Sequence, residues 1–241
     1  MLLNTSLDVV LPCNNPGLDW EKKALFHYQQ LRTNINKNVE INVFIVDDGS
    51  CNGIDSTQID FLKNNIPCFK FITYNKNLGK GYALRTAVKQ TSSQIIIYTD
   101  IDFPYRMENI TEIYKLLSED KVDIAVGVRN GNYYKKLPLM RVIISLALKI
   151  INFIVFPRLI VKDTQSGLKG FNTKGKEVFL KTKINSFLFD LEFLVLASRK
   201  KDLNISWITV EAREDITFST IKWKTIKTEL INFAYIFRNV R

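Results

Sequence analysis

Apolar strand-like runs alternate with helix-like patterns through the first half of the chain, and this alternation constrains the fold more than any other feature. The strand patterns fall at 7–12, 41–46, 69–74, 94–99 and 122–127, and the helix patterns at about 20–33, 54–64, 80–90 and 106–118. Strands separated by helices are typical of a parallel sheet with crossover helices. The sequence therefore predicts an α/β fold with a mostly parallel sheet flanked by helices.

Length and composition favour one domain over residues 1–241. The chain has neither an internal repeat nor an evident linker, and 46% of its residues are hydrophobic. A chain of this size buries enough surface to fold without disulfides or metals. Its three cysteines are odd in number and lack metal-type spacing, so we expect reduced thiols in a cytoplasmic protein. The N-terminus lacks the pattern of a signal peptide.

The net charge of +10 has to be explained by partners or by solubility, because charge does not determine fold. Phosphorylated substrates, an anionic membrane surface and nucleic acid are the three classes of partner that suit a basic protein. No helix-turn-helix, zinc-finger or aromatic RNA-binding pattern accompanies the charge. We therefore expect no nucleic-acid partner.

Two aspartates follow the apolar run at 94–99, in the sequence Asp100-Ile101-Asp102. Ligands of open α/β sheets bind at the carboxyl ends of the strands. Two carboxylates one residue apart at that edge can face a hard cation and bring it against a ligand phosphate. The same short pattern also occurs in ordinary turns, so its meaning depends on the neighbouring motifs.

Two further motifs are predicted at the same edge of the sheet. The strand at 41–46 leads into Asp47-Asp48-Gly49-Ser50, whose carboxylates can accept hydrogen bonds from a nucleotide base or ribose. The segment Asn77-Leu78-Gly79-Lys80-Gly81-Tyr82-Ala83 opens a predicted helix. Its glycines predict a backbone packed tightly on a ligand, and Lys80 can meet a phosphate at a helix N-terminus.

The segment 139–156 is almost wholly apolar, but four polar residues interrupt it with spacings of four, four and three. They are Arg141, Ser145, Lys149 and Asn152, which share one narrow stripe of a helix. The segment is too short and too polar for a membrane span. Two interpretations remain: a core helix with a solvated stripe, or an interfacial helix with its wide apolar face in lipid.

The last stretch, 217–241, is basic and has helical apolar spacing at Ile226, Leu230, Phe233 and Phe237. Its cations, set against the single acid Glu229, are Lys222, Lys224, Lys227, Arg238 and Arg241. The pattern predicts a basic amphipathic helix. Such a helix suits an anionic membrane surface or docks on the protein with its charged face in solvent.

Taken in order, these motifs resemble those of the family 2 glycosyltransferases, which have the GT-A fold. The order is Pro12 in the first strand, then Asp47 to Ser50, Asn77 to Ala83, and Asp100 to Asp102. Later segments are similar to the polyprenyl-phosphate (dolichyl-phosphate mannose synthase-like) branch: Gly127-Val128-Arg129, Arg141 with Ser145, Asp163-Thr164-Gln165-Ser166-Gly167, and Phe189-Asp190-Leu191-Glu192. Members of this branch often place amphipathic helices at the membrane surface, which favours the interfacial interpretation of 139–156.

The chain also departs from the family pattern. The first motif reads Pro12-Cys13-Asn14-Asn15-Pro16, so Asn15 keeps its place while Pro16 replaces the usual acid. Glu21 is a candidate replacement for that acid. Pro104 stands where the branch often has a glutamine, two residues after Asp102, so one metal or lipid-phosphate contact is missing.

The resemblance implies an inverting, metal-dependent transfer of a sugar from a nucleoside diphosphate sugar. Asp102, helped by Asp100, is expected to hold Mg²⁺ or Mn²⁺. The expected donor contacts, all within a nucleotide-sugar and metal half at 1–130, are Pro12, Asn15, Asp47, Asp48, Lys80, Asp100 and Arg129. The remainder, 131–241, is expected to be the acceptor half. The predicted location is the cytoplasm, peripheral to the inner face of the membrane.

The hypotheses about function differ in the acceptor that receives the sugar. A polyprenyl phosphate is already anionic, so it requires positioning by cations and by an acceptor-side wall more than it requires a base. The expected acceptor contacts are Arg129, Arg141, Asp163, Ser166, Gly167, Arg213 and Lys222. The alternative acceptor is a hydroxyl of a growing cell-surface glycan, with Asp190 or Glu192 as the catalytic base. A third hypothesis is a non-catalytic binding module. The sequence predicts no oligomeric state.

Overall fold

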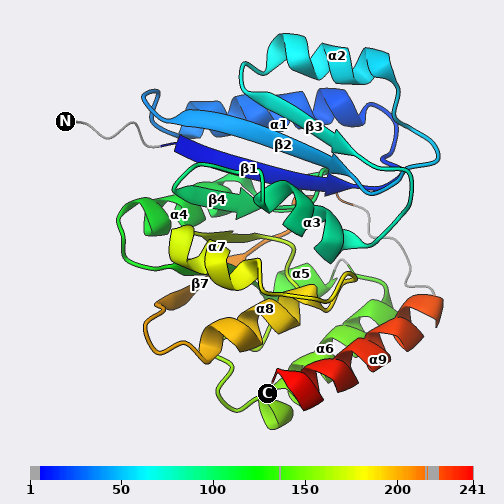
Figure 1. Cartoon of the computed structure of the whole chain (residues 1–241), viewed down its shortest axis with the longest axis vertical. Coiled ribbons are helices and arrows are strands. Elements are labelled where there is room, and N and C mark those ends of the chain that lie inside the picture. Colours follow the sequence, from blue (N-terminus) through cyan, green and yellow to red (C-terminus); the bar gives the residue numbers. More distant parts are fainter. Residues whose placement is uncertain (1–5, 136, 215, 217–222, 241) are drawn as a thin grey trace.

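The computed structural model describes residues 6–135, 137–214, 216 and 223–240. Its centre is a seven-stranded sheet with strand order β3-β2-β1-β4-β6-β5-β7 (Figure 1). The strands are β1 Ser6–Cys13, β2 Glu40–Asp47, β3 Phe69–Thr73, β4 Ile95–Tyr98, β5 Ile124–Arg129, β6 Lys169–Phe171 and β7 Ile205–Val210. All neighbouring strands pair in parallel except those beside β6, which runs antiparallel between β4 and β5. The predicted mostly parallel sheet is confirmed.

The helices are α1 Trp20–Asn34, α2 Ser56–Asn65, α3 Lys80–Val88, α4 Met107–Ser118, α5 Gly131–Lys135, α6 Leu139–Val155, α7 Thr173–Phe179, α8 Phe189–Ser198 and α9 Trp223–Asn239. Helices α1, α2 and α4 pack on one face of the sheet, and α3, α7 and α8 pack on the other. Helices α6 and α9 lie side by side at one end of the molecule (Figure 1), where the rings of Phe156 and Phe233 are 5.7 Å apart.

The central strands form because their side chains are apolar on both faces. Leu7, Val9 and Leu11 of β1 enter the core under α1 and α4, whereas Val10 enters the core under α3 and α8. Every residue of β4 is buried. Continuous apolar runs are typical of parallel strands that helices cover on both sides. The carboxyl ends of β1, β2, β4 and β5 consequently meet at one edge.

Helix α6 points its polar side toward the protein and its apolar side outward, which is the reverse of the usual amphipathic helix. Its polar stripe faces the protein, with Asn152 only 1% exposed, while Leu139, Phe153 and Ile154 are 74%, 67% and 69% exposed. The interpretation as a core helix with a solvated stripe is therefore wrong. Neighbouring α9 adds Leu230 and Ile231 to the exposed apolar surface. Within the described residues, no helix combines the length and the apolar character that crossing a membrane requires.

Candidate active site

The predicted donor-side residues lie together at the carboxyl edge of the sheet. Pro12 is the penultimate residue of β1, Asp47 ends β2, Asp100 and Asp102 follow β4, and Arg129 ends β5. This arrangement follows from the parallel directions of these strands. It is also the edge at which open α/β sheets bind ligands.

Asp48 holds the glycine loop that precedes α3. Its carboxylate accepts hydrogen bonds from the Tyr74 hydroxyl at 2.8 Å and from the backbone N–H groups of Leu78 and Gly79 at 2.8 and 2.9 Å. The side chain is buried, so these donors replace water. Asp48 therefore shapes the loop that presents Lys80.

Replacing Asp48 with Asn is expected to destabilise the protein by about 1.5–3 kcal/mol, because the loop amides lose a charged acceptor. Thermal unfolding measures the effect. Asp60→Asn is the matched control, since Asp60 forms an exposed ion pair with Lys63 on α2. Equal melting temperatures of the two variants would show that the Asp48 contacts contribute nothing to stability.

Asp47 and Asn15 connect neighbouring loops of the donor side. Asp47 accepts hydrogen bonds from the Ser50 backbone N–H at 3.0 Å and from the Thr73 hydroxyl at 2.9 Å. The Asn15 side chain accepts from the backbone N–H groups of Cys51 and Asn52 at 2.9 and 3.1 Å. Glu21, the candidate replacement acid, lies on α1 and accepts from Gln58 of α2 at 3.3 Å.

The tight packing of the glycine loop is against the protein itself. A Cβ on Gly79 would lie 2.4 Å from the Asn185 carbonyl oxygen, and one on Gly81 would lie 2.5 Å from the Ile184 carbonyl oxygen. The Gly81 N–H donates to the Asn185 carbonyl at 2.7 Å. The prediction that these glycines admit a ligand is therefore corrected: they admit the segment that leads into α8.

The two aspartates of the Asp-x-Asp motif have different environments. Asp100 is half exposed and forms an ion pair with Lys80, whose charge also lies in the field of Asp190. Burial, and then the charge of Asp100, raise the pKa of Asp102, while Lys80 and Arg213 oppose this shift. A divalent cation would relieve this repulsion between carboxylates, so the donor set fits Mg²⁺ or Mn²⁺.

Only two carboxylates belong to this set. Among the described residues, no group of three or more histidine, cysteine, aspartate or glutamate side chains is arranged to hold a metal. Mg²⁺ is usually bound by one or two carboxylates together with substrate phosphates. The motif therefore fits a cation that is shared with a phosphorylated ligand.

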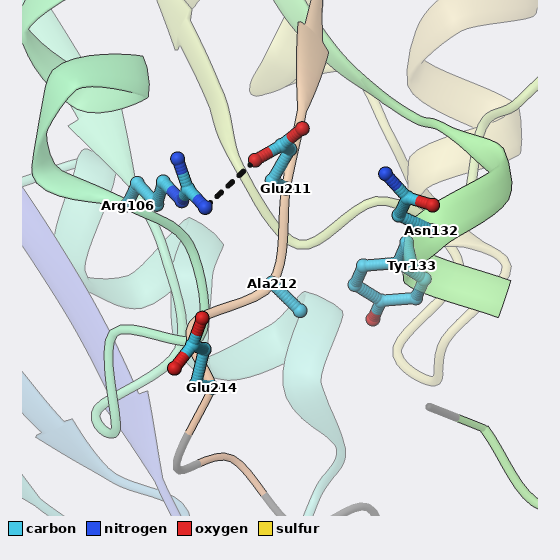
Figure 2. Close-up of a pocket in the computed structure, with 6 residues that line it drawn as sticks. All are labelled: Arg106, Asn132, Tyr133, Glu211, Ala212 and Glu214. Carbon is cyan, nitrogen blue, oxygen red and sulfur yellow. Dashed lines mark ion pairs between the residues drawn. The ribbon is translucent and has the colours of Figure 1, made fainter. Parts of the chain in front are cut away.

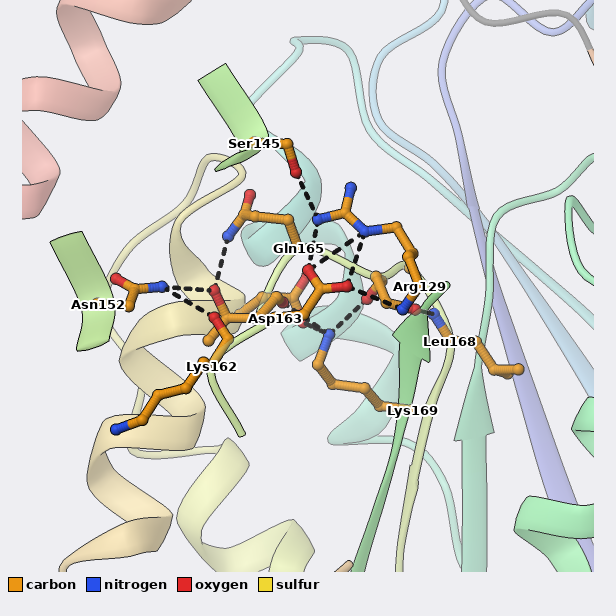
Figure 3. A network of polar contacts seen from close by, with 12 residues as sticks. Arg129, Ser145, Asn152, Lys162, Asp163, Gln165, Leu168 and Lys169 are labelled. Carbon is orange, nitrogen blue, oxygen red and sulfur yellow. Dashed lines mark hydrogen bonds and ion pairs between the residues drawn. The ribbon is translucent and has the colours of Figure 1, made fainter. Parts of the chain in front are cut away.

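Arg129 is joined to the Asp163 loop and to α6 (Figure 3). Its Nε lies 3.0 and 3.2 Å from the two carboxylate oxygens of Asp163, and its Nη2 donates to the Ser145 hydroxyl at 2.8 Å. Burial alone raises the pKa of Asp163, but the hydrogen bonds and charge of Arg129 outweigh burial and lower it. The structure thus pairs a predicted phosphate contact with a predicted acceptor-wall residue.

Three of the other acceptor-side residues, Arg141, Ser166 and Gly167, lie next to this pair. The Ser166 hydroxyl lies 3.1 Å from the Tyr105 hydroxyl, which also accepts from the Gly167 N–H at 2.9 Å. Arg141 is half-buried on α6, and burial and the charge of Arg129 lower its pKa. Arg213 contacts His27 of α1, and its charge also reaches Asp102. Lys222 lies outside the described residues.

Both candidate bases are buried and already hydrogen-bonded. Asp190 Oδ1 accepts from the Tyr98 hydroxyl at 2.5 Å and lies 2.7 Å from the ammonium of Lys169. Glu192 Oε2 accepts from the backbone N–H groups of Lys183 and Ile184, both at 2.8 Å. Lys169 could not be identified from the sequence, because nothing around it marks a lysine as buried.

A small polar pocket of about 190 Å³ opens near the acceptor-side residues (Figure 2). It is lined by Arg106, Asn132, Tyr133, Glu211, Ala212 and Glu214. Two of the lining residues, Arg106 and Glu211, form an ion pair at 3.1 Å. Its Tyr133 ring stacks on Tyr105, with 6.0 Å between ring centroids. The pocket is therefore one aromatic layer away from Ser166 and Gly167.

The chain is similar in sequence to enzymes that act on a lipid phosphate. A dolichyl-phosphate beta-glucosyltransferase of Trichomonas vaginalis is 25% identical, over 88% of this chain and 67% of its own length. The corresponding enzyme of Saccharomyces cerevisiae is 27% identical, over 70% of this chain and 57% of its own length. The chain thus spans about three-fifths to two-thirds of the length of these relatives.

A solved structure shows the fold of the chain, and a family model shows its family. Glucosyl-3-phosphoglycerate synthase from Mycobacterium tuberculosis, solved in complex with uridine-diphosphate, superposes with a TM-score of 0.65 at 16% identity, over 92% of this chain and 75% of that one. This likeness establishes the GT-A fold. The model of glycosyl transferase family 2 matches residues 28–179, which is more than half of the sequence. The chain therefore belongs to the family 2 glycosyltransferases.

Proposed function

We propose that this chain transfers a sugar, with inversion and with the help of a divalent metal, from a nucleoside diphosphate sugar to a polyprenyl-phosphate-type lipid. The choice of a lipid-phosphate acceptor rests on one observation: the carboxylates of Asp190 and Glu192 are already used in contacts within the protein. Each is at most 4% exposed, and each already accepts hydrogen bonds from the protein through one carboxylate oxygen. A hydroxyl acceptor needs an available base, whereas a phosphate is already ionised. The named relatives act on dolichyl phosphate, which agrees with this choice.

The cations of the acceptor side suit an anionic ligand. Arg129 and Arg141 lie close enough for the charge of Arg129 to lower the pKa of Arg141. Asp163 holds Arg129 in place through both carboxylate oxygens. An acceptor phosphate beside Arg141 and Ser145 would lie in the positive field of both guanidinium groups. Arg141, Arg129 and Ser145 are thus the proposed orienting groups.

On the donor side, Asp100 and Asp102 are proposed to hold the divalent cation. When bound, Mg²⁺ or Mn²⁺ supplies positive charge against the departing diphosphate. A related structure of the mycobacterial synthase contains Mn²⁺ and uridine-diphosphate. Lys80, held beside Asp100, is proposed to bind the diphosphate, and Asp47, Asp48 and Asn15 are proposed to shape the nucleotide pocket.

We further propose that α6 and α9 rest on the membrane that carries the acceptor, at its inner, cytoplasmic face. The outer surface of α6 exposes the apolar side chains of Leu139, Met140, Ile143, Ile150 and Ile154. A helix with a wide apolar face binds at the boundary between head groups and acyl chains. Ser145, on the opposite side of α6, contacts Arg129, so the acceptor phosphate would be received just above the lipid surface.

The test is transfer from a panel of nucleotide sugars to a short polyprenyl phosphate in detergent micelles with Mn²⁺. The corresponding polyprenol, which lacks only the phosphate, is the matched acceptor control. We expect a lipid-linked sugar from the phosphate, none from the alcohol, and loss of the product with EDTA. Transfer to a glycan hydroxyl but not to the lipid phosphate would contradict the proposal and favour Asp190 or Glu192 as a base.

Gly167→Ala is expected to weaken metal-dependent transfer. A Cβ at this position would lie 2.6 Å from Asp100 Oδ2 and 3.4 Å from the ammonium of Lys80. The carboxylate must then move, and a displacement of about 1 Å can cost roughly 100-fold in rate. Kinetics and Mn²⁺ titration measure the effect. Gly131→Ala is the control, because its Cβ meets nothing within 4 Å. Equal activity of both variants would show that the position of Asp100 does not matter.

A further inference from the structure

Lys169 is a completely buried lysine at the centre of the sheet. It begins β6, the antiparallel strand between β4 and β5, and its side chain is 0% exposed. Its ammonium lies 2.7 Å from Asp190 Oδ1 and donates to the carbonyls of Ser166 and Thr164 at 2.5 and 3.1 Å. Figure 3 shows the Lys169 side chain beside the Asp163 loop. An ammonium has three donors, so these contacts use all of them.

This ion pair is not explained by stability alone. Burial lowers the pKa of Lys169, and the charge of Asp190 opposes that shift. Replacing a buried ion pair by apolar residues of similar size is often neutral or stabilising. The aromatic core on this side, which includes Tyr98, Phe171 and Phe179, would accept such residues. The charges are therefore expected to serve another purpose.

The contacts of Lys169 join the two sides of the site. One partner is the 163–167 loop, in which Asp163 binds Arg129 and Gly167 lies against Asp100. The other partner is Asp190 at the start of α8, and Tyr98 connects it to β4, which leads to the Asp-x-Asp motif. Two carbonyls that are held by one ammonium fix the path of the loop between these points.

We infer that Lys169 is a positioning residue that sets the acceptor-side loop against the metal-binding turn. In this arrangement Asp190 is the counter-ion of Lys169, and it does not take a proton from the acceptor. The inference rests on the proposed function, because it assigns the loop to the acceptor. It adds a role for a fully buried residue whose three ammonium donors are all used within the protein.

The decisive variant is Lys169→Met/Asp190→Asn, which removes both charges and keeps both side chains similar in size. Lys169→Met alone would leave Asp190 buried without its ion-pair partner and is expected to fold poorly. For the double variant we expect a folded protein with unchanged binding of the nucleotide donor. Its kcat/KM for the lipid phosphate should fall by roughly 100-fold, because the loop is displaced. If the ion pair only stabilised the fold, its removal would not lower kcat/KM for the lipid phosphate while leaving donor binding unchanged.

Lys176→Met is the matched control. Lys176 also donates to a backbone carbonyl, that of Thr91 at 2.7 Å, but it belongs to α7 and has no contact with the 163–167 loop. Hydrogen exchange of the Gly167 amide, which is bonded to the Tyr105 hydroxyl, gives a readout that needs no catalysis. We expect faster exchange at Gly167 in the double variant and no change in the control.

The outcomes separate this inference from the proposed function. Wild-type transfer and wild-type exchange at Gly167 in the double variant would overturn the positioning role. If the wild-type protein uses no phosphate acceptor, the proposed function fails, and the exchange of Gly167 alone decides whether Lys169 orders the loop. Faster exchange together with a selective loss of acceptor use supports both.

Discussion

Asp102→Ala is expected to lower kcat/KM for sugar transfer by on the order of 10³-fold while the protein remains folded. Loss of charge stabilisation at a metal-binding carboxylate amounts to several kcal/mol, and each 1.4 kcal/mol corresponds to about a tenfold change. The substitution should not unfold the chain, because burial and the charge of Asp100 already disfavour ionised Asp102. Removing the carboxylate also removes that repulsion.

Two measurements check this expectation. Product formation at saturating donor gives the rate, and Mn²⁺ titration of the protein with nucleoside diphosphate gives the metal affinity, which should fall in parallel. Asp60→Asn, at the exposed ion pair on α2, should change neither. Unaltered biological function of Asp102→Ala would favour the hypothesis of a non-catalytic binding module with this fold.

The second large effect is expected from Ile150→Glu/Ile154→Glu on the outer face of α6. Both side chains are exposed, at 61% and 69%, so the change leaves the core intact. Burying one isoleucine in an apolar environment contributes about 1.5–3 kcal/mol. Losing two such contributions should weaken binding to anionic vesicles by roughly 10²–10⁴-fold.

Co-sedimentation with vesicles measures the partitioning, and transfer to a short acceptor in solution should be unaffected. Trp207→Glu is the matched control, because Trp207 is also exposed, at 54%, but lies on β7. Undiminished vesicle binding by the α6 variant would contradict the membrane assignment. If the same variant converted an oligomer into monomers, the α6 face would instead be a contact between copies of the chain.

Strands β1 to β5 were predictable from the apolar character of their sequences, but β7, which pairs in parallel with β5, was not predicted. A run such as Ile95 to Tyr98 is apolar on both faces, which only a covered strand requires. Strand β6 could not be found in the same way. It has only three residues. A lysine such as Lys169 is usually exposed, and its buried partner Asp190 lies in a different part of the sequence.

The orientation of α6 marks another limit of the sequence. Helical spacing groups Arg141, Ser145 and Asn152 on one face, but it does not say which face the protein covers. The partners that turn the stripe inward, Arg129 and Thr164, come from β5 and from the loop before β6. The glycine loop is similar: Gly79 and Gly81 marked a close approach correctly, but the approaching group is the protein's own backbone.

The position of β6 determines how the chain could be divided. After α6 the backbone returns to the middle of the sheet, and β6 pairs with β4 on one side and β5 on the other. A fragment ending near residue 130 would have an open seam between β4 and β5, although it carries the whole Asp-x-Asp motif. The two halves are therefore expected to regain activity only when co-expressed and reassembled. Acceptor specificity would have to be exchanged between relatives by grafting loops, since the halves are not separable modules.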